Sequence, residues 1–324
     1  MADRNVRSAI ILSKAESTYG TDPTPDASTD ALQVTGFDVT PINASNVSRS
    51  ILRGHMGGFE QLVGDRFVQA TYGVELVGSG TAGTAPGWAS QLFACGFAGA
   101  ATSSTRYDFT LVSSSIGSLT NYYHDSGVKH VATGVRGNVD IALELGERPL
   151  LNFTMLGLYS TPTAASNPSG TFTAVQAPQA ITNANTADIV LGCTHSTSGA
   201  PALASGTTYP SRGIRISLGN SVNHLPLLGG ESIHLADREV TGEITLDVTA
   251  DEEVTLMGNV EAATLTSIGF VHGTVTGRKV LVFMPYCQLV NPRKADVNGK
   301  RLITFGFRAI PSAGNDELRI VTSF

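Results

Sequence analysis

Apolar and polar residues alternate with a period of two along most of this 324-residue chain, and this alternation constrains its fold more than any other feature. Such alternation puts apolar side chains on one face of a β-strand and polar side chains on the other. Turn-forming Gly, Asn, Asp and Pro residues separate the alternating segments. The strands predicted in this way are residues 71–77, 139–145, 150–158, 212–218, 240–248, 279–290 and 302–310. The chain is therefore predicted to be mainly β.

A helical pattern occurs in only two short segments. Residues 85–97 follow Thr84, which is expected to be the N-cap, and they contain Pro86 in the first turn. Residues 251–262 begin with three acidic residues, which favour the N-terminus of a helix. The side chains expected to be buried are Trp88, Leu92, Phe93 and Cys95 in the first helix and Val254, Met257 and Val260 in the second.

The second half of the chain repeats the organisation of the first. Each half contains a long segment with glycines and few apolar residues, at 41–64 and at 217–236, and then an Asp-Arg pair, a strand and a short helix. A long segment without regular structure is unusual inside a compact domain and tends to be functional. We favour tandem copies of one domain over a chance similarity between two β-rich halves. The expected organisation is an N-terminal arm at 1–30, a first domain at 31–160, a Pro/Ser/Gly-rich linker at 161–170 and a second domain at 171–324.

The composition argues against several classes of function. The net charge is −6 and charged residues make up only 15% of the chain, whereas a protein that wraps nucleic acid needs a basic face. The three cysteines are far apart and form no CxxC pair, so we expect buried thiols rather than disulfides or a zinc site. No run of apolar residues reaches the roughly 18 that a membrane span needs, and the apolar stretch 9–12 is too short for a signal peptide.

Two motifs are weak indications of an enzyme. Residues 78–83 (GSGTAG) match the glycine pattern of dinucleotide-binding folds, but Asp108 is the nearest acidic candidate and no β-α-β alternation follows. A glycine-rich connection into a helix is the simpler interpretation. His124, Asp125 and Ser126 are adjacent in the sequence, whereas catalytic triads are assembled from separate parts of a fold. We therefore expect no enzyme activity, no cofactor and no metal.

Acidic residues lie on the polar face of several predicted strands. The candidates are Glu75, Asp140, Glu144, Glu243 and Asp247. An ordinary solvated sheet face explains any one of these strands. A sheet whose polar face lines an acidic channel is the alternative. The presence of the pattern in both halves strengthens it without deciding between the two.

Three stretches of the chain resemble the major tail tube proteins of long-tailed (siphovirus-type) bacteriophages. They are residues 14–25 (KAESTYGTDPTP), residues 75–86 (ELVGSGTAGTAP) followed by Cys95-Gly96-Phe97, and residues 147–158 (ERPLLNFTMLGL). The resemblance is strong over residues 10–160 and weaker beyond. It implies two tandem tail-tube-like β-sandwich domains, each with one short α-helix and a long hairpin loop.

The resemblance also implies a structural protein of the virion tail that is assembled in the cytoplasm of the host bacterium. Tube subunits form rings, and rings stack into a tube around a tape-measure protein. The expected partners are other copies of the chain, the tape-measure protein, the tail terminator and distal tail proteins, and double-stranded DNA that passes without sequence-specific binding. No membrane partner is expected. Relatives with two fused tube domains form trimeric rings with pseudo-sixfold symmetry, which we favour here over hexamers.

Residue roles follow from this expectation. The five acidic candidates are expected to face the lumen, where negative charge would repel DNA and let it slide. Residues 1–30, 41–64 and 217–236 are expected to contact the neighbouring ring. The stacking candidates are Arg49, Arg53, Phe59, His224 and Leu227.

Two other classes of function remain open from the sequence. A phage decoration protein or receptor-binding β module would also be rich in β-structure, Gly and Thr, but it would use exposed aromatic residues, and the single Trp88 lies on an apolar stripe. A dinucleotide-binding enzyme depends on residues 78–83 alone.

Overall fold

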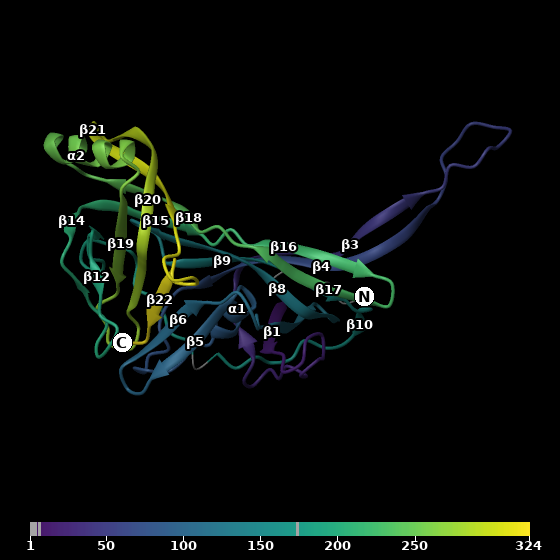
Figure 1. Cartoon of the computed structure of the whole chain (residues 1–324). Helices are drawn as coiled ribbons and strands as arrows, with labels where there is room; N and C mark the ends of the chain where they lie inside the picture. Colours follow the sequence, from purple (N-terminus) through teal and green to yellow (C-terminus); the bar gives the residue numbers. More distant parts are fainter. Residues whose placement is uncertain (1–4, 6–7, 173–174) are drawn as a thin grey trace.

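The computed structural model describes residues 5, 8–172 and 175–324, and it is mainly β, with 52% strand and 6% helix. Figure 1 shows the elements in space. In chain order they are β1 (Ala9–Ala15), β2 (Ala31–Leu32), β3 (Thr35–Ser48), β4 (Gln61–Glu75), α1 (Ala89–Ala94), β5 (Phe97–Thr102), β6 (Arg106–Leu111), β7 (Leu119–Asp125), β8 (Val128–Glu144), β9 (Leu150–Tyr159), β10 (Thr163–Ala164), β11 (Ile189–Leu191), β12 (Thr194–His195), β13 (Leu203–Ala204), β14 (Thr207–Tyr209), β15 (Ser211–Ser217), β16 (Ser221–Leu227), β17 (Gly230–Asp237), β18 (Thr241–Leu246), α2 (Ala250–Glu261), β19 (Leu265–His272), β20 (Val280–Val297), β21 (Lys300–Ala309) and β22 (Arg319–Thr322).

One continuous curved sheet runs through both halves of the chain. Its strand order is β3-β4-β9-β8-β15-β18-β21-β20, so the first half supplies four neighbouring strands and the second half the next four. The halves join where β8 pairs with β15, from Glu144 opposite Gly213 to Asp140 opposite Ser217. In Figure 1 the hairpin β3–β4 extends from one end of this sheet, and β20, β21 and α2 rise at the other end.

A second layer of strands covers one face of this sheet. In the first half it contains β1, β2, β5, β6, β7 and the N-terminal part of β8, and in the second half β11, β14, β19, the N-terminal part of β20 and β22. The C-terminal strand β22 pairs with β20 on one side and with β6 of the first half on the other. The strands on either side of the glycine loop at 78–83, β4 and β5, form only antiparallel pairings among the described residues, so the loop lies in no β-α-β unit.

The apolar core lies between the two layers. Val139, Ile141 and Leu143 of β8 are buried, while Asp140 between them points to the other face. This alternation confirms the period-two prediction for the strand, and the polar face follows from the geometry of β-structure. Cys95, Cys193 and Cys287 are all buried free thiols, as predicted.

The helix α1 is shorter than predicted. It spans Ala89–Ala94 rather than 85–97, and its N-cap is Trp88, which makes no capping hydrogen bond, so the prediction that Thr84 caps it was wrong. The residues before it form a turn that lets the Trp88 indole Nε1 donate to the carbonyl of Val77, 3.0 Å away. Trp88, Leu92 and Cys95 are buried as expected.

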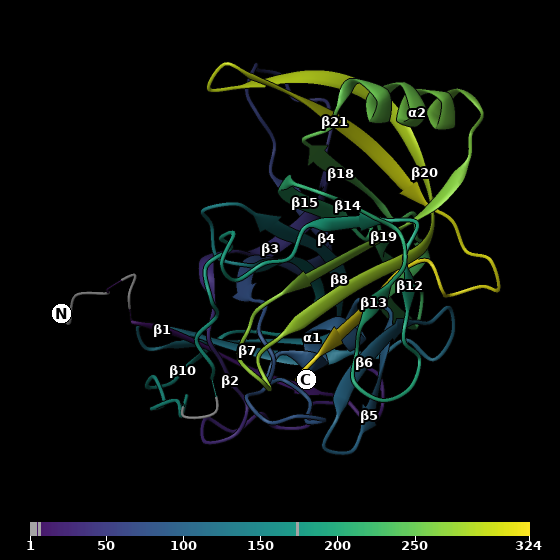
Figure 2. The same cartoon turned by 90° about the vertical axis from the view of Figure 1, so that its left-hand side faces the viewer.

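The helix α2 begins at Ala250, and its N-cap is Thr249. The Thr249 side chain accepts from the backbone of Glu252, and the Glu252 carboxylate accepts from the backbone of Thr249, which is a capping box. Figure 2 shows α2 at the end of the molecule above β20 and β21, where the strands cover only part of its surface. For that reason only Leu256 is buried, and Val254, which was predicted to be buried, is 73% exposed.

Substitution Thr249→Ala should lower the free energy of unfolding by about 1 kcal/mol, because the backbone N–H of Glu252 in the first turn of α2 loses its capping acceptor, the Thr249 hydroxyl. Thermal unfolding followed by circular dichroism measures the change. Thr255→Ala is the matched control, since Thr255 lies within α2 and its hydroxyl donates to a helix carbonyl. An equal loss in both variants would contradict the capping role.

The two long segments predicted to be loops are largely hairpins. β3 reaches Ser48 and β4 begins at Gln61, so only residues 49–60 of the first segment lie outside strands. The second segment contains the hairpin β16–β17. Alternation is weak in both because much of each hairpin has no buried face, while main-chain pairing still satisfies the backbone. Neither helix of the described chain has the length and apolar character needed to cross a membrane.

Candidate assembly interface

The five acidic residues predicted from strand alternation all lie on the face of the continuous sheet opposite the core. Asp140 and Glu144 alternate with buried residues of β8, Glu243 precedes buried Ile244, and Asp247 and Glu75 follow the last buried residues of their strands. The structure therefore brings all five onto one surface. We call this surface the polar sheet face.

Four of these acids are ion-paired with cations from neighbouring segments. The pairs are Glu75 with Arg148 at 3.2 Å, Glu144 with Arg215 at 2.8 Å, Glu243 with Arg293 at 2.8 Å, and Asp247 with Lys300. Asp140 accepts a hydrogen bond from the Ser217 hydroxyl at 2.5 Å. The polar sheet face therefore carries charges of both signs rather than a purely acidic surface.

The ion pair of Glu144 with Arg215 crosses the junction between the two halves. Hydrogen bonding from the Arg215 guanidinium lowers the pKa of Glu144, and the same hydrogen bond raises the pKa of Arg215. Both side chains are exposed, so the pair contributes little to stability and mainly sets the local charge.

Both ends of the continuous sheet are open edges. Among the described residues, β3 pairs only with β4, and residues 293–297 of β20 pair only with β21. An edge strand presents a row of backbone N–H and C=O groups that can pair with another chain. These two edges are candidate assembly sites.

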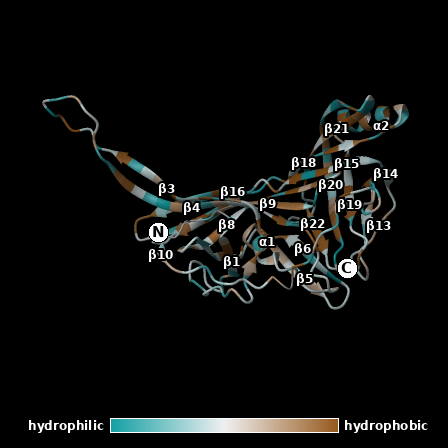
Figure 3. Cartoon of the chain, turned by 180° about the vertical axis from the view of Figure 1, so that it is seen from behind, coloured by the Kyte–Doolittle hydropathy of each residue, from teal (hydrophilic) through white to brown (hydrophobic). Residues whose placement is uncertain are grey.

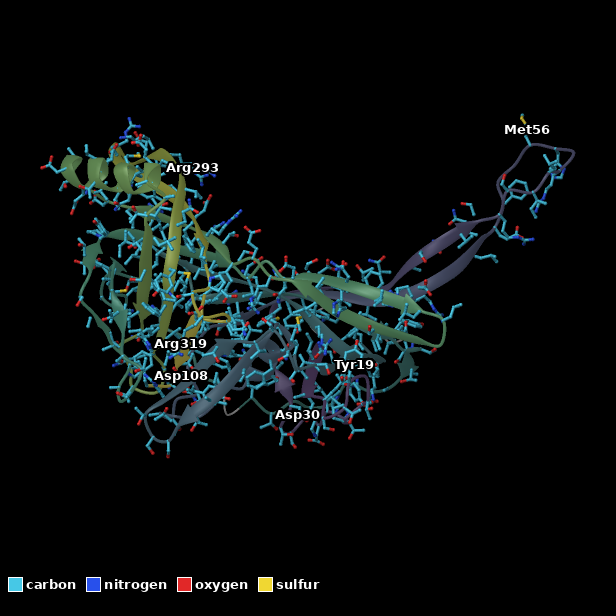
Figure 4. The ribbon with its side chains drawn as sticks, in the orientation of Figure 1. Tyr19, Asp30, Met56, Asp108, Arg293 and Arg319 are labelled. Carbon is cyan, nitrogen blue, oxygen red and sulfur yellow. The ribbon has the colours of Figure 1, made fainter. Side chains whose placement is uncertain are left out.

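The hairpin β3–β4 and its tip form an arm that extends from the body of the protein. Figure 1 and Figure 3 show the arm from opposite sides, and Figure 4 labels Met56 near its end. Leu52 and Met56 are 102% and 98% exposed, and other apolar side chains of the arm are also exposed. Exposed apolar residues that gather in one segment mark interaction sites. The further exposed apolar residues of the arm are Ile42, Val47, Ile51, Leu62 and Val63.

The stacking candidates divide into two groups. Arg49, Arg53 and Phe59 lie together in the arm, where Glu60 pairs with both arginines and the Arg53 guanidinium lies 4.4 Å from the centre of the Phe59 ring. His224 and Leu227 belong to the hairpin β16–β17 instead. Sequence reasoning missed Leu52 and Met56, although apolar residues in a glycine-rich segment without periodicity were a usable signal.

The hairpin β16–β17 packs across the first half of the chain. The backbone N–H of Ile233 donates to the Tyr19 hydroxyl at 2.5 Å, and the carbonyl of Ile233 accepts from Arg136 at 3.0 Å. The Arg136 guanidinium also lies over the Tyr19 ring, at 4.7 Å from its centre. Burial lowers the pKa of Arg136 and raises the pKa of Tyr19. The hairpin β16–β17 therefore holds the second half of the chain against the first. Figure 4 labels Tyr19 beneath this hairpin.

A buried charged cluster also connects the two halves. Arg106 pairs with Asp108 at 2.8 Å, and Arg319 of β22 lies 3.8 Å from Asp108. Figure 4 shows Asp108 and Arg319 close together at the base of the molecule. Arg106 also donates to the carbonyl of Ser196 at 2.7 Å, in the loop next to His195.

Stability should decrease in acid because of His195. Burial, with the nearby charges of Arg319 and Arg106, lowers the pKa of His195 to about 4. The unfolded chain takes up this proton near pH 6.5 and the folded chain does not, so the stabilisation is complete above pH 6.5 and decreases as the pH falls toward 4. The slope for this group is at most about 1.4 kcal/mol per pH unit. Urea unfolding at several pH values should show a shallower dependence in His195→Gln, and an unchanged slope would contradict the prediction.

The two motifs considered for enzyme chemistry are the glycine loop at 78–83 and the segment 124–126. The N–H groups of Gly78 and Gly80 donate to the carbonyls of Arg278 and Gly277, so the glycine loop is occupied by protein backbone rather than open to a phosphate. His124 is buried, with its pKa lowered by burial, in a strand next to a tight turn. In the described part of the chain no group of three or more His, Cys, Asp or Glu residues could hold a metal ion.

A cavity of about 560 Å³ lies beside the start of β3. Trp88 and Val34 line it, together with charged side chains that already pair with each other, such as Lys14 with Asp30 at 3.4 Å. This pairing leaves no set of charges directed at a ligand.

Comparison with known proteins agrees with an assembly function. The model of a family described as phage tail tube protein matches residues 7–313, nearly the whole chain. No curated protein sequence matches the chain.

Proposed function

Because this chain belongs to the phage tail tube protein family, whose members are structural components of the virion tail, we propose that three copies of it close into a ring and that rings stack into the tube that conducts the genome. In this proposal the chain consists of two tandem tube domains, residues 31–160 and 171–324, joined by the linker 161–170. Each ring then has pseudo-sixfold symmetry. A role as a decoration or receptor-binding module receives no support from the family match.

The observation that carries the proposal is the continuous sheet with four strands from each half and an open edge at each end. Three chains with eight strands each supply 3 × 8 = 24 strands. At a spacing of about 4.8 Å and a tilt of about 40°, such a barrel is about 48 Å across. Side chains reduce the bore to about 38 Å, which admits a DNA duplex about 20 Å wide.

The same arithmetic favours three chains over six. A ring of six chains would have 6 × 8 = 48 strands and a barrel about 96 Å across, far wider than one duplex requires. We therefore retain the trimeric ring.

In the proposed ring the polar sheet face lines the lumen. The charges on this face differ from those of a purely repulsive wall, since Arg148, Arg215, Arg293 and Lys300 offset four of the acids. A wall of closely spaced opposite charges has a weak field at the distance of the duplex, because their contributions cancel within a Debye length of about 8 Å. DNA would then slide without being held by a basic surface.

The proposed partners follow from the assembly. The arm, with the N-terminal region 1–30 and the hairpin β16–β17, contacts the adjacent ring. The lumen holds the tape-measure protein before DNA passes, and the tail terminator and distal tail proteins cover the ends of the tube. Assembly takes place in the cytoplasm of the host bacterium, and the protein carries out no enzymatic reaction.

Electron microscopy and native mass spectrometry of the purified protein test the proposal. Hollow tubes, or rings with the mass of three chains, are the expected result. Compact monomers at every concentration, or rings of six chains, would contradict it.

A further inference from the structure

We propose that the ring closes when residues 36–40 of β3 pair with residues 293–297 of β20 from a neighbouring copy, in the register that β15 and β8 already have within one chain. This inference rests on the proposed ring. It adds which strands meet and which residues lie opposite each other.

The two halves of the continuous sheet have the same strand order. β4 and β18 each precede a helix. β4 lies between β3 and β9, and β18 lies between β15 and β21. β15 is therefore the counterpart of β3, and β8 is the counterpart of the C-terminal part of β20. The pairing of β8 with β15 joins the two halves, and the same two kinds of edge remain open at the ends of the sheet.

The internal junction also gives the register. Aligning β4 with β18 by their last buried residues puts Lys294 in the position of Ile141 and Val39 in the position of Ile216. Ile216 lies opposite Ile141 within the chain. Val39 is therefore expected opposite Lys294 of the neighbour. The adjacent pairs that follow are Thr40 with Arg293 and Asp38 with Ala295.

A glycine at the open edge supports this register. Gly213 of β15, at φ 118°, lies at a bulge, and a Cβ atom built on it would be 2.0 Å from the carbonyl oxygen of Leu143 in β8. Gly36 occupies the matching bulge of β3 at φ 60°, yet a Cβ atom there would meet no described atom within 4 Å. In β15 the glycine allows the backbone of β8 to approach closely. Gly36 would allow the same close approach of a strand to β3, where a single chain supplies no neighbouring strand.

Prolines limit the pairing to the same short stretch on both edges. Within the chain, the N–H of Leu218 continues the junction by donating to the carbonyl of Val139 at 3.1 Å. Pro41 occupies the counterpart position of Leu218 and has no N–H to donate, and Pro292 directly precedes Arg293 on the other edge. Proline on an edge strand restricts how far another chain can pair with it. Five residues on each strand remain available.

Paired cysteines test the register in the assembled protein. In Asp38→Cys/Ala295→Cys the two thiols lie directly opposite, within the distance that a disulfide spans, and oxidation should link the chains of a ring into covalent oligomers of up to three. In Thr40→Cys/Ala295→Cys the thiols are diagonal, and little linkage is expected. Ala142→Cys/Arg215→Cys marks the equivalent pair inside one chain and should give an internal disulfide without oligomers. The native cysteines are buried, so they add no background.

The outcomes separate this inference from the proposed function. Rings that form normally but link through the diagonal pair, or through neither pair, would overturn the register and leave the ring proposal standing. Failure of the unmodified protein to form rings would overturn both.

A glycine variant gives a second, independent measurement. Gly36→Ala should reduce the yield of rings about tenfold or more, because the new methyl group would meet the neighbouring strand. Gly229→Ala is the matched control, since Gly229 also has a positive φ, of 91°, and a Cβ atom there would meet no described atom within 4 Å. Equal ring yields in the two variants would overturn the inference.

Discussion

Replacing residues 49–60 with a short Gly-Ser linker should leave rings intact and abolish tubes. This replacement removes Leu52 and Met56, whose side chains no described part of the same chain covers. The strands β3 and β4 remain paired with each other up to the tip. Burying a large apolar side chain contributes about 1.5–3 kcal/mol, and a trimeric ring would present three such arms at once. Electron microscopy with sedimentation should then detect rings but no long particles.

A milder variant isolates the apolar contacts. Leu52→Ser/Met56→Ser keeps the length of the arm and should shorten the tubes or raise the protein concentration needed to form them. Val254→Ser is the matched control, because Val254 is 73% exposed but lies on α2, outside the proposed stacking contacts. Normal tubes after complete replacement of residues 49–60 would refute the role of the arm in stacking.

The second large effect is expected in the core. Ile320→Ala should lower the free energy of unfolding by about 2–5 kcal/mol, because the Ile320 side chain is 0% exposed in β22 and its loss leaves a cavity. β22 pairs with both β6 and β20, so the loss weakens the attachment of the second half of the chain to the first. The midpoint of urea unfolding, measured at a protein concentration below that of assembly, reports the change.

The matched control for this variant is Val254→Ala on α2, where the side chain is 73% exposed and the change should be within about 0.5 kcal/mol. Similar unfolding midpoints for the two variants would show that the C-terminal strand is not a structural part of the first half.

Local patterns predicted seven strand segments, nearly all of them in the continuous sheet, but they missed other strands, such as β7 and β19, and the connections between strands. The alternation at 139–145 and 150–158 identified β8 and β9 because one face of each is buried and the other is not. The pairings β8–β15 and β22–β6 join residues far apart in the sequence, and no local pattern encodes such a pairing. The arm was predicted as a loop because its strands lack a buried face.

The candidate surfaces show the same division. Alternation was enough to assign Glu144 and Glu243 to the polar side of their strands, and the structure agrees. Their partners Arg215 and Arg293 come from other strands, so the mixed charge of the surface depended on a register that the sequence does not reveal. That Leu52 and Met56 lie in an exposed arm was likewise evident only from the structure.

The covalent connection between the halves has a consequence for how the assembly could diversify. In the proposed tandem arrangement, one of every two junctions between domains forms while a single chain folds, and only the other junction has to form by association of separate chains. Two such hairpins could also differ, and in the structure β3–β4 extends as an arm while β16–β17 packs against the first half of the chain. A ring of three such chains would carry one arm for every two domains. Each added ring would then have three equivalent orientations on the ring below, whereas a ring of six identical single domains would have six.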